Sequence, residues 1–203
     1  MTSTSGSLRW RSGEGETLGL EHVELKVSES GIAAEAVVAG GGETAFGARW
    51  RITLDPDWTS TRSLHLTRLG GPTVALRHDG YGEWSDGEGK KRKEFQGLLD
   101  CVVLGSPFGF VQVAKRFAAK AAKTQKFDVV TVSLPDLAVA RVAAVLEPLE
   151  AGRRYRLTLG ETATEVEIDG EVCGRQAKVV LDNFIDSTSG VGKFSDLAAA
   201  RDV

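Results

Sequence analysis

Apolar and polar side chains alternate along much of this chain, and this pattern restricts its fold more than any other feature. The alternation is clearest in residues 22–27, 49–54, 63–67, 154–159 and 165–169. Successive side chains of a β-strand point to opposite faces, so each segment is expected to place one face on a core and the other in water. Strands with this half-buried character are typical of antiparallel sheets.

Turn-forming residues separate the alternating segments. Glycine is the commonest of them, since the 203 residues include 24 glycines and only 5 prolines. Asp79-Gly80, Asp86-Gly87 and Asp169-Gly170 suit two-residue hairpins, because both turn residues can take positive φ, and Gly40-Gly41-Gly42 is expected at a hairpin tip. Many short strands joined by turns predict a mainly β fold, namely a single-domain curved antiparallel sheet or β-roll with few short helices.

Three segments depart from the alternation. Residues 113–126 are rich in alanine and carry five basic residues and no acidic residue, which predicts a short helix or a mobile basic loop. Residues 137–146 fit either a strand or a buried helix, and we favour a strand because Leu134-Pro135-Asp136 resembles a turn. Residues 195–201 suit a capped terminal helical turn.

No linker-like or low-complexity stretch divides the chain, which we therefore interpret as one domain. We expect a disordered N-terminal tail at residues 1–7, a β-rich domain at 8–186 and a C-terminal tail or short helix at 187–203. The N-terminus lacks the apolar core of a secretory signal, and no segment approaches the ~18 apolar residues of a transmembrane helix. These features predict a cytoplasmic protein.

The charge balance argues against one class of partner. The chain has 25 basic and 28 acidic residues, a formal net charge of −3. Binding of nucleic acid requires a clustered surplus of Lys and Arg that neutralises phosphates. We therefore expect no nucleic-acid partner.

Sequence motifs for catalysis and metal binding were not found. Cys101 and Cys173 lie far apart and no CxxC is present, so we expect two reduced thiols, with a single disulfide as the alternative, and no zinc or redox motif. His22, His65 and His78 are dispersed, and surface or capping roles are the simplest interpretation. A metal site would require the fold to bring these histidines together. We predict no cofactor, no metal and no catalytic residue.

The tryptophans differ in their surroundings. Trp50 alternates with apolar strand residues, which favours core packing. Trp58 follows Asp55-Pro56-Asp57, and Trp84 ends the turn-rich segment 79–84, so both are expected near turns with polar neighbours. Aromatic rings with a polar tip are typical of the rims of sites for sugars or amphiphiles, and packing within the turns is the alternative.

A second aromatic feature precedes the basic stretch 113–126. Phe108 and Phe110 flank a glycine after the apolar segment 101–104. An apolar lip beside cations would accept an amphiphile with an anionic or sugar head group. The alternative is a solvated basic face with Phe117 turned inward.

The ordered set of short motifs resembles a family of bacterial proteins described as putative glycolipid-binding. The resemblance covers residues 8–185 and rests on Leu8-Arg9-Trp10, Gly19-Leu20-Glu21-His22, Ala48-Arg49-Trp50-Arg51-Ile52, Asp55-Pro56-Asp57-Trp58, Arg62, Leu64, Asp79-Gly80-Tyr81-Gly82-Glu83-Trp84, Gly97-Leu98-Leu99-Asp100, Ser106-Pro107-Phe108, Arg116 and Leu134-Pro135-Asp136-Leu137. The family's usual Gly-Cys-…-Asp-…-Pro pattern is replaced here by Gly97-Leu98, Val102 and Pro107, which makes the central region more apolar. The resemblance implies a β-rich roll similar in shape to bacterial lipoprotein carriers and lipid-binding lipoproteins, and it implies no cofactor or catalytic residue.

The leading hypothesis is a non-enzymatic protein that binds an amphiphilic lipid, with glycolipids among the candidates, in the hollow of a curved sheet. The predicted ligand-binding residues are Trp50, Trp58, Arg62, Trp84, Phe108, Phe110 and Arg116. One alternative is a hydrolase or other enzyme with a site assembled across strands, for which a histidine beside a carboxylate of perturbed pKa would be evidence. Another is a scaffold or oligomerising module with a filled core.

Overall fold

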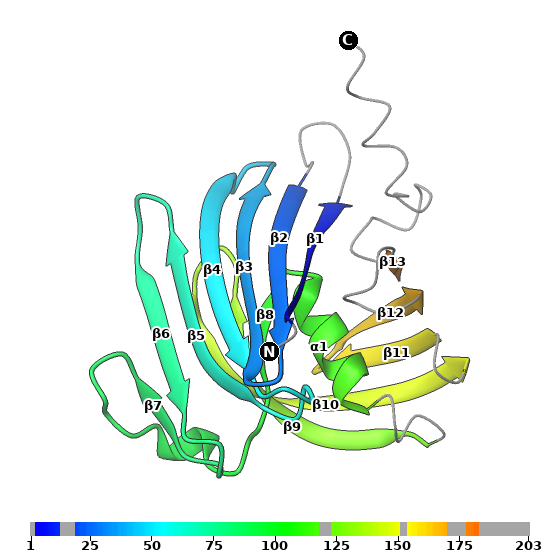
Figure 1. Ribbon diagram of the computed structural model, residues 1–203. Coiled ribbons are helices and arrows are strands. Elements are labelled where there is room, and N and C mark those ends of the chain that lie inside the picture. Colours follow the sequence, from blue (N-terminus) through cyan, green and yellow to red (C-terminus); the bar gives the residue numbers. More distant parts are fainter. Residues whose placement is uncertain (1–2, 13–18, 118–122, 151–153, 170–177, 183–203) are drawn as a thin grey trace.

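In the computed structural model the chain forms two curved β-sheets with an α-helix between them (Figure 1). The structure describes residues 3–12, 19–117, 123–150, 154–169 and 178–182. The first sheet is an antiparallel meander of seven strands: β1 (Ser3–Ser12), β2 (Gly19–Ser28), β3 (Gly31–Gly40), β4 (Phe46–Leu54), β5 (Thr61–Arg68), β6 (Thr73–His78) and β7 (Trp84–Asp86). The second sheet contains six strands in the spatial order β13 (Lys178–Asp182), β12 (Thr162–Asp169), β11 (Arg154–Leu159), β10 (Val139–Glu150), β9 (Gln125–Ser133) and β8 (Cys101–Leu104). The predicted mainly β fold with curved antiparallel sheets is confirmed.

The alternation of apolar residues sets the register of the first sheet. Leu25, Ala34, Ile52, Leu64 and Leu76 lie opposite one another on five successive strands, and all five are buried. A shift of one residue in any strand would turn its apolar side chains into water, so the core specifies this register. The other face of the sheet carries the polar members of each alternating pair.

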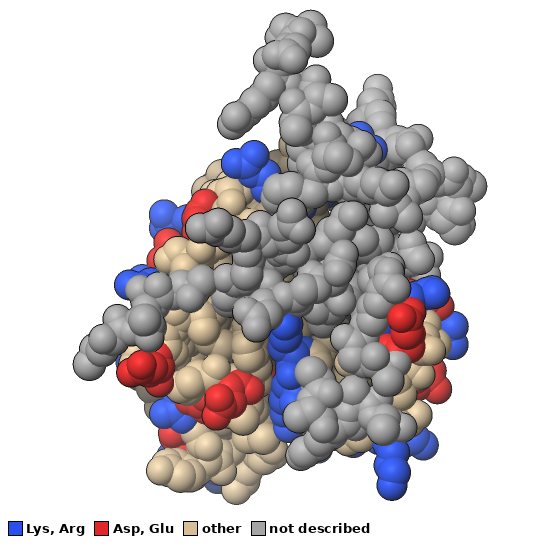
Figure 2. Space-filling model, turned by 45° about the vertical axis from the view of Figure 1, so that its right-hand side comes forward, with Lys and Arg blue, Asp and Glu red and all other residues tan. Residues whose placement is uncertain are grey.

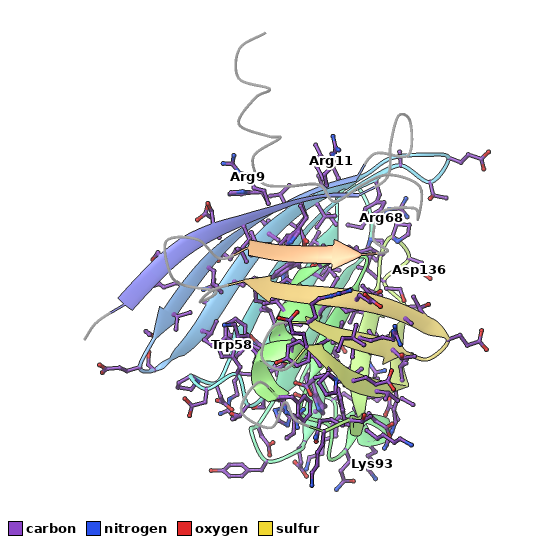
Figure 3. The ribbon with its side chains drawn as sticks, turned by 90° about the vertical axis from the view of Figure 1, so that its right-hand side faces the viewer. Arg9, Arg11, Trp58, Arg68, Lys93 and Asp136 are labelled. Carbon is purple, nitrogen blue, oxygen red and sulfur yellow. The ribbon has the colours of Figure 1, made fainter. Side chains whose placement is uncertain are left out.

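The helix α1 (Phe108–Phe117) connects β8 and β9, the parallel pair of the second sheet. Parallel neighbours need such a crossover, because a tight hairpin joins only antiparallel strands. Eight of the ten helix residues are buried. The ring of Phe108 lies 5.2 Å from that of Trp50 on β4, and the ring of Phe117 lies 4.7 Å from that of Phe127 on β9. The helix thus fills the space that the two sheets enclose (Figures 1 and 3).

This packing corrects the prediction for the central region. The helix begins at Phe108, five residues before the predicted stretch 113–126, and Phe108 and Phe110 are buried rather than forming an exposed lip. Residues 108–114 are all buried, and Lys115 and Arg116 in the last turn are only partly so. The predicted stretch started where basic residues become frequent and therefore missed the apolar first turn of the helix. The apolar hollow expected to hold a ligand is occupied by α1 itself.

Two polar contacts attach α1 to the sheets. Gln112 donates a hydrogen bond from Nε2 to Thr61 Oγ1 of β5 at 2.7 Å, and the same oxygen accepts the backbone N–H of Cys101 at 3.0 Å. Arg116 forms an ion pair with Asp100, whose side chain is fully buried. These contacts specify which way the helix faces, in addition to its apolar burial.

Several other predictions concern where strands, turns and tails begin and end. The strand favoured at 137–146 is confirmed as β10, and residues 40–42 do connect the hairpin β3–β4. The boundary of the N-terminal tail is wrong, because Ser3 to Ser7 already pair with β2 through backbone hydrogen bonds that do not depend on apolar side chains. Residues 187–203, including the predicted helical turn at 195–201, and Gly170 lie outside the described residues. In the described part of the chain, no helix has the length and apolarity needed to span a bilayer.

Candidate ligand-binding site

A cavity of about 180 Å³ lies between the end of the first sheet and the segments that flank α1. Its described lining residues are Trp10, Gly19, Leu20, Glu21, Val38, Ala39, Gly40, Gly41, Phe46, Gly105, Pro107 and Leu134. Trp10, Glu21 and Val38 occupy one inward-facing row across β1, β2 and β3. Pro107 and Leu134 close the cavity from the ends of β8 and β9. Glu21 carries the one ionisable side chain among these described residues.

Glycines allow close packing in the wall of the cavity. A side chain at Gly40 would place its Cβ only 2.2 Å from the ring of Phe46, so the absence of that atom lets the Phe46 ring lie against the backbone of β3. Gly105 has a φ of +94°, a backbone conformation that favours glycine, where the chain leaves β8 toward α1. Backbone peptide groups at these glycines form part of the wall and can hydrogen-bond to a polar ligand.

Glu21 is the chemically distinctive residue of the cavity. It is only 5% exposed, although it lies on a strand between apolar neighbours. Its Oε1 atom accepts a hydrogen bond from Trp50 Nε1 at 2.9 Å and another from Ser106 Oγ at 2.7 Å. Its Oε2 atom has no hydrogen-bond partner in the described part of the structure.

The protonation state of Glu21 follows from this environment. Burial raises the pKa of Glu21 to about 8, and the hydrogen bonds from Ser106 and Trp50 offset only part of that shift. The side chain is therefore mostly a neutral carboxylic acid at neutral pH. Because both donors point at Oε1, that atom takes the role of the carbonyl oxygen. The O–H group then belongs to Oε2, which can donate a hydrogen bond to a ligand.

The sequence contains a signal for the burial of Glu21, which was missing from the predicted binding residues. Glu21 is in phase with Val23, Leu25 and Val27, the apolar series of its strand, whereas His22 and Glu24 are in the polar series. A carboxyl at an inward position of a half-buried strand predicts a buried acid. Ser106, which is 85 positions away in sequence, could not have been assigned to it.

The structure gathers three of the seven predicted binding residues into one aromatic cluster. Phe108 lies between Trp50 and Trp58, with ring centroids 5.2 Å and 6.2 Å away. Trp50 and Phe108 are buried, and Trp58 is half-buried with a φ of 61° in the turn after β4. The cluster is a part of the core and not of the described cavity lining. Trp50 nevertheless contacts the site through its hydrogen bond to Glu21.

The other predicted residues lie apart from the cavity. Trp84 is buried, donates its Nε1–H to the carbonyl of Leu98 at 2.8 Å, and stacks on His78 at 4.8 Å. Arg62 is 3.5 Å from Asp55 in a partly exposed ion pair, and Arg116 pairs with buried Asp100. Phe110 is buried within α1. None of these four residues belongs to the described lining.

The three histidines lie on three different strands. His22 accepts a hydrogen bond from Arg9 and lies 2.7 Å from Glu24 on the outer face, and His65 is exposed. His78 is buried, and burial lowers its pKa. Its Nδ1 donates to the carbonyl of Thr61 at 2.9 Å and its Nε2 accepts the N–H of Gly82 at 3.0 Å, so both ring nitrogens are occupied. Among the described residues no group of His, Cys, Asp and Glu is arranged to hold a metal ion.

Charged side chains of both signs are scattered over the described part of the surface seen in Figure 2. Cys101 is fully buried and is a free thiol, and burial raises its pKa, which disfavours the reactive thiolate. Cys173 lies outside the described residues. Neither cysteine belongs to the described lining of the cavity. The chemistry available there comes from the carboxyl group of Glu21, whose pKa is raised by burial, among aromatic and aliphatic side chains.

Together, the two sheets wrapped around a helix and the small cavity that contains buried Glu21 define a β-rich protein with a candidate ligand-binding site. The chain belongs to the family described as "Putative glycolipid-binding", whose model matches residues 7–173. This match confirms the resemblance seen in the sequence motifs.

A solved structure has a similar fold. It is the crystal structure of a DUF1089 family protein from Pseudomonas aeruginosa, with a TM-score of 0.62 and 21% sequence identity. The similarity covers 79% of this chain and 87% of that chain. At this identity the likeness shows the fold alone. No curated protein matches the chain.

Proposed function

We propose that this protein is a non-enzymatic binder of an amphiphile with an uncharged, hydroxyl-bearing head group, such as a glycolipid, and that the head group enters the Glu21 cavity. The single observation that carries the proposal is the Oε2 atom of Glu21, a buried carboxyl oxygen without a partner in the described structure. A buried polar atom left unsatisfied costs about 1–3 kcal/mol, so a ligand hydroxyl that pairs with it would bind with a corresponding gain.

The surroundings of Glu21 favour an uncharged head group over a charged one. A neutral carboxylic acid both donates and accepts hydrogen bonds, which matches the hydroxyl groups of a sugar. A charged head group would lose its hydration in the cavity without meeting an opposite charge from the described lining residues. Trp10 and Phe46 supply aromatic surface for the apolar face of a sugar ring.

The cavity volume limits how much of the ligand can be enclosed. A volume of about 180 Å³ is smaller than the ~300 Å³ at which sites for drug-sized ligands begin. It accommodates one ring or a short chain, so the remainder of an amphiphile would extend beyond the cavity. The family description supports a lipid-like ligand, and it is a description of the family rather than of this chain.

The raised pKa of Glu21 also favours a second candidate, an enzyme that uses Glu21 as a general acid. Glycoside hydrolysis ordinarily needs a second carboxylate on the other side of the scissile bond. Among the described lining residues, Glu21 is the only one with a carboxyl group. Ser106 is fully buried and is outside the described lining, so its hydroxyl supports the orientation of Glu21 better than it would serve as a nucleophile.

The proposal is tested by titrating octyl glucoside, below its micellar concentration, into the purified protein and following tryptophan fluorescence or heat. We expect saturable binding to the wild-type protein and weaker binding of octyl sulfate, which has the same chain and a charged head. Glu21→Met removes the carboxyl group and should lower the affinity for octyl glucoside by about three- to tenfold, which corresponds to the loss of one hydrogen bond. Glu24→Gln, on the outer face of the same strand, is the matched control and should bind as the wild type does.

The pH dependence provides a second readout. If the protonated acid is the binding form, wild-type affinity should decrease as the pH rises above about 8. Glu21→Gln keeps a donor at this position and cannot ionise, so its affinity should stay nearly constant over the same range. Equal affinity of the wild-type protein and Glu21→Met, with both variants folded by circular dichroism, would refute the assignment of this cavity.

A further inference from the structure

On the face of the first sheet that points away from α1, basic and apolar side chains gather at the end of the strands nearest the Glu21 cavity. Two neighbouring cross-strand rows there contain Arg11, Leu20, Ala39 and Gly47 in one, and Arg9, His22, Val37, Arg49 and Thr67 in the other. Leu69 continues the first row, because its N–H bonds to the carbonyl of Gly47. No acidic residue occurs among these residues, and Glu24 and Glu35 belong to the following row.

We call the exposed side chains of this end the outer patch: Arg9, Arg11, Leu20, Val37, Arg49 and Leu69. Arg9 donates a hydrogen bond to Nδ1 of His22 at 3.1 Å, and it forms no ion pair with a carboxylate of the described residues, since Glu24 contacts the other nitrogen of that ring. Arg11 and Arg49 have no ion pair with a carboxylate of the described residues, in contrast to Arg51, which lies 3.2 Å from Glu35. The patch is therefore positive on a chain whose formal net charge is −3.

The apolar members of the outer patch are unusually exposed. Leu20, Val37 and Leu69 have 43%, 57% and 64% of their surface accessible. They account for three of the five large hydrophobic side chains that are exposed among the described residues. Apolar side chains grouped with cations on one face mark an interaction surface.

The outer patch lies against the candidate site. Leu20 and Ala39 belong to the rows of the patch and also line the Glu21 cavity, which lies behind this end of the sheet. Arg9 and Arg11 project from β1 at the same end of the molecule, whereas Lys93 lies at the opposite end (Figure 3). A partner bound to the patch would thus be next to the cavity.

We propose that the outer patch docks the protein on the surface of an anionic phospholipid bilayer. A guanidinium group can donate two parallel hydrogen bonds to two oxygens of one phosphate. The negative potential of an anionic leaflet also attracts basic residues near it. The exposed leucines and valine would bury their apolar atoms among the head groups. A nucleic acid would satisfy the arginines and leave these apolar side chains without a partner, so the bilayer fits both halves of the patch.

Docking itself does not depend on the proposed function. The conclusion that docking brings the cavity to a source of lipid does rest on it. The two ideas are separated by using variants of different residues, namely Glu21 for the cavity and the arginines for the patch.

The experiment measures co-sedimentation of the full chain with vesicles of phosphatidylcholine mixed with phosphatidylglycerol, and with vesicles of phosphatidylcholine alone. We expect binding to the mixed vesicles that weakens as salt is added, and little binding to the neutral ones. Each arginine near an anionic surface contributes about fivefold, so Arg9→Gln/Arg11→Gln/Arg49→Gln should weaken binding by about a hundredfold. Leu20→Ser/Val37→Ser/Leu69→Ser should also weaken it.

The matched control is Lys26→Gln/Arg77→Gln/Lys93→Gln, which removes the same charge from positions outside the patch and should retain most of the wild-type binding. Glu21→Gln should dock normally even if it alters uptake of octyl glucoside. The proposal is overturned if the arginine variant and the control bind vesicles equally, or if mixed and neutral vesicles are bound alike. It is also overturned if the patch variants abolish binding to a DNA duplex or self-association while vesicles are not bound.

Discussion

The substitution Glu21→Gln tests whether a neutral acid is held in the core of this protein. The pKa of Glu21 is raised by burial from an ordinary value of 4.5 to about 8 in the folded state. Below about pH 4.5 both the folded and the unfolded chain hold the proton, so Glu21 causes no pH dependence there. Between these values the unfolded chain releases the proton while the folded protein keeps it, so the free energy of unfolding falls as the pH rises.

The size of this effect follows from the shift in pKa. Each unit of difference between the two states is equivalent to about 1.4 kcal/mol, so a rise from 4.5 to about 8 corresponds to a total loss of about 5 kcal/mol once the pH exceeds the folded value. A domain is typically stable by about 5–15 kcal/mol, so the loss would be a large fraction of the total. Glutamine has nearly the same shape and still accepts hydrogen bonds from Trp50 and Ser106, but it does not titrate.

Urea unfolding of the wild-type protein and of Glu21→Gln, measured across this pH range, checks the reasoning. The two proteins should have similar stability at or below about pH 4.5, and the variant should become the more stable one by several kcal/mol once the pH exceeds about 8. Glu24→Gln, which changes an exposed carboxyl on the same strand, should follow the wild-type curve. Parallel curves for the wild-type protein and Glu21→Gln would refute the raised pKa, because they would mean that Glu21 ionises at the same pH in both states.

Three further predictions concern α1 and the strand β8 that precedes it. Gly109→Ala should destabilise the fold by about 1–3 kcal/mol in urea unfolding despite its better helix propensity, because the new Cβ would lie 2.5 Å from Val102 Cγ1; a stabilised variant would contradict this close packing. Arg116→Met should cost about 3–5 kcal/mol, since it leaves the Asp100 carboxylate buried without its partner, and Arg116→Met/Asp100→Asn should recover much of that loss; equal stability of the single and double variants would argue against the ion pair. Cys101 should resist alkylation in the folded protein and react after unfolding, as judged by mass spectrometry of its peptide, whereas rapid labelling of the native chain would show that β8 opens readily.

Much of the first sheet could be predicted from local patterns. The alternation around Leu25, Ile52 and Leu64 identifies both the strands and the faces that they bury, because a half-buried strand repeats every second residue. The glycines at residues 40–42 likewise indicate the connection between β3 and β4. These features depend on neighbouring residues, so sequence alone is sufficient for them.

The candidate site was predicted only in part. Trp50 was assigned correctly to a strand, yet its link to the cavity depends on Glu21, which is on another strand. Trp84, Arg62 and Arg116 were grouped with it because aromatic and basic residues suit an amphiphile, and the structure places them with His78, Asp55 and Asp100 instead. Composition identifies residues suited to a ligand, but it does not determine which of them lie together.

The sequence by itself determined that this chain forms half-buried strands and that turns separate them. The tertiary structure decided that α1 fills the space between the sheets and that the remaining cavity lies at one end of them. It also decided that Ser106 and Trp50 both meet the same oxygen of Glu21. The physical reason is that strand faces follow a local period of two residues, whereas the contacts of a buried helix and a buried acid depend on segments that come together only when the chain is folded.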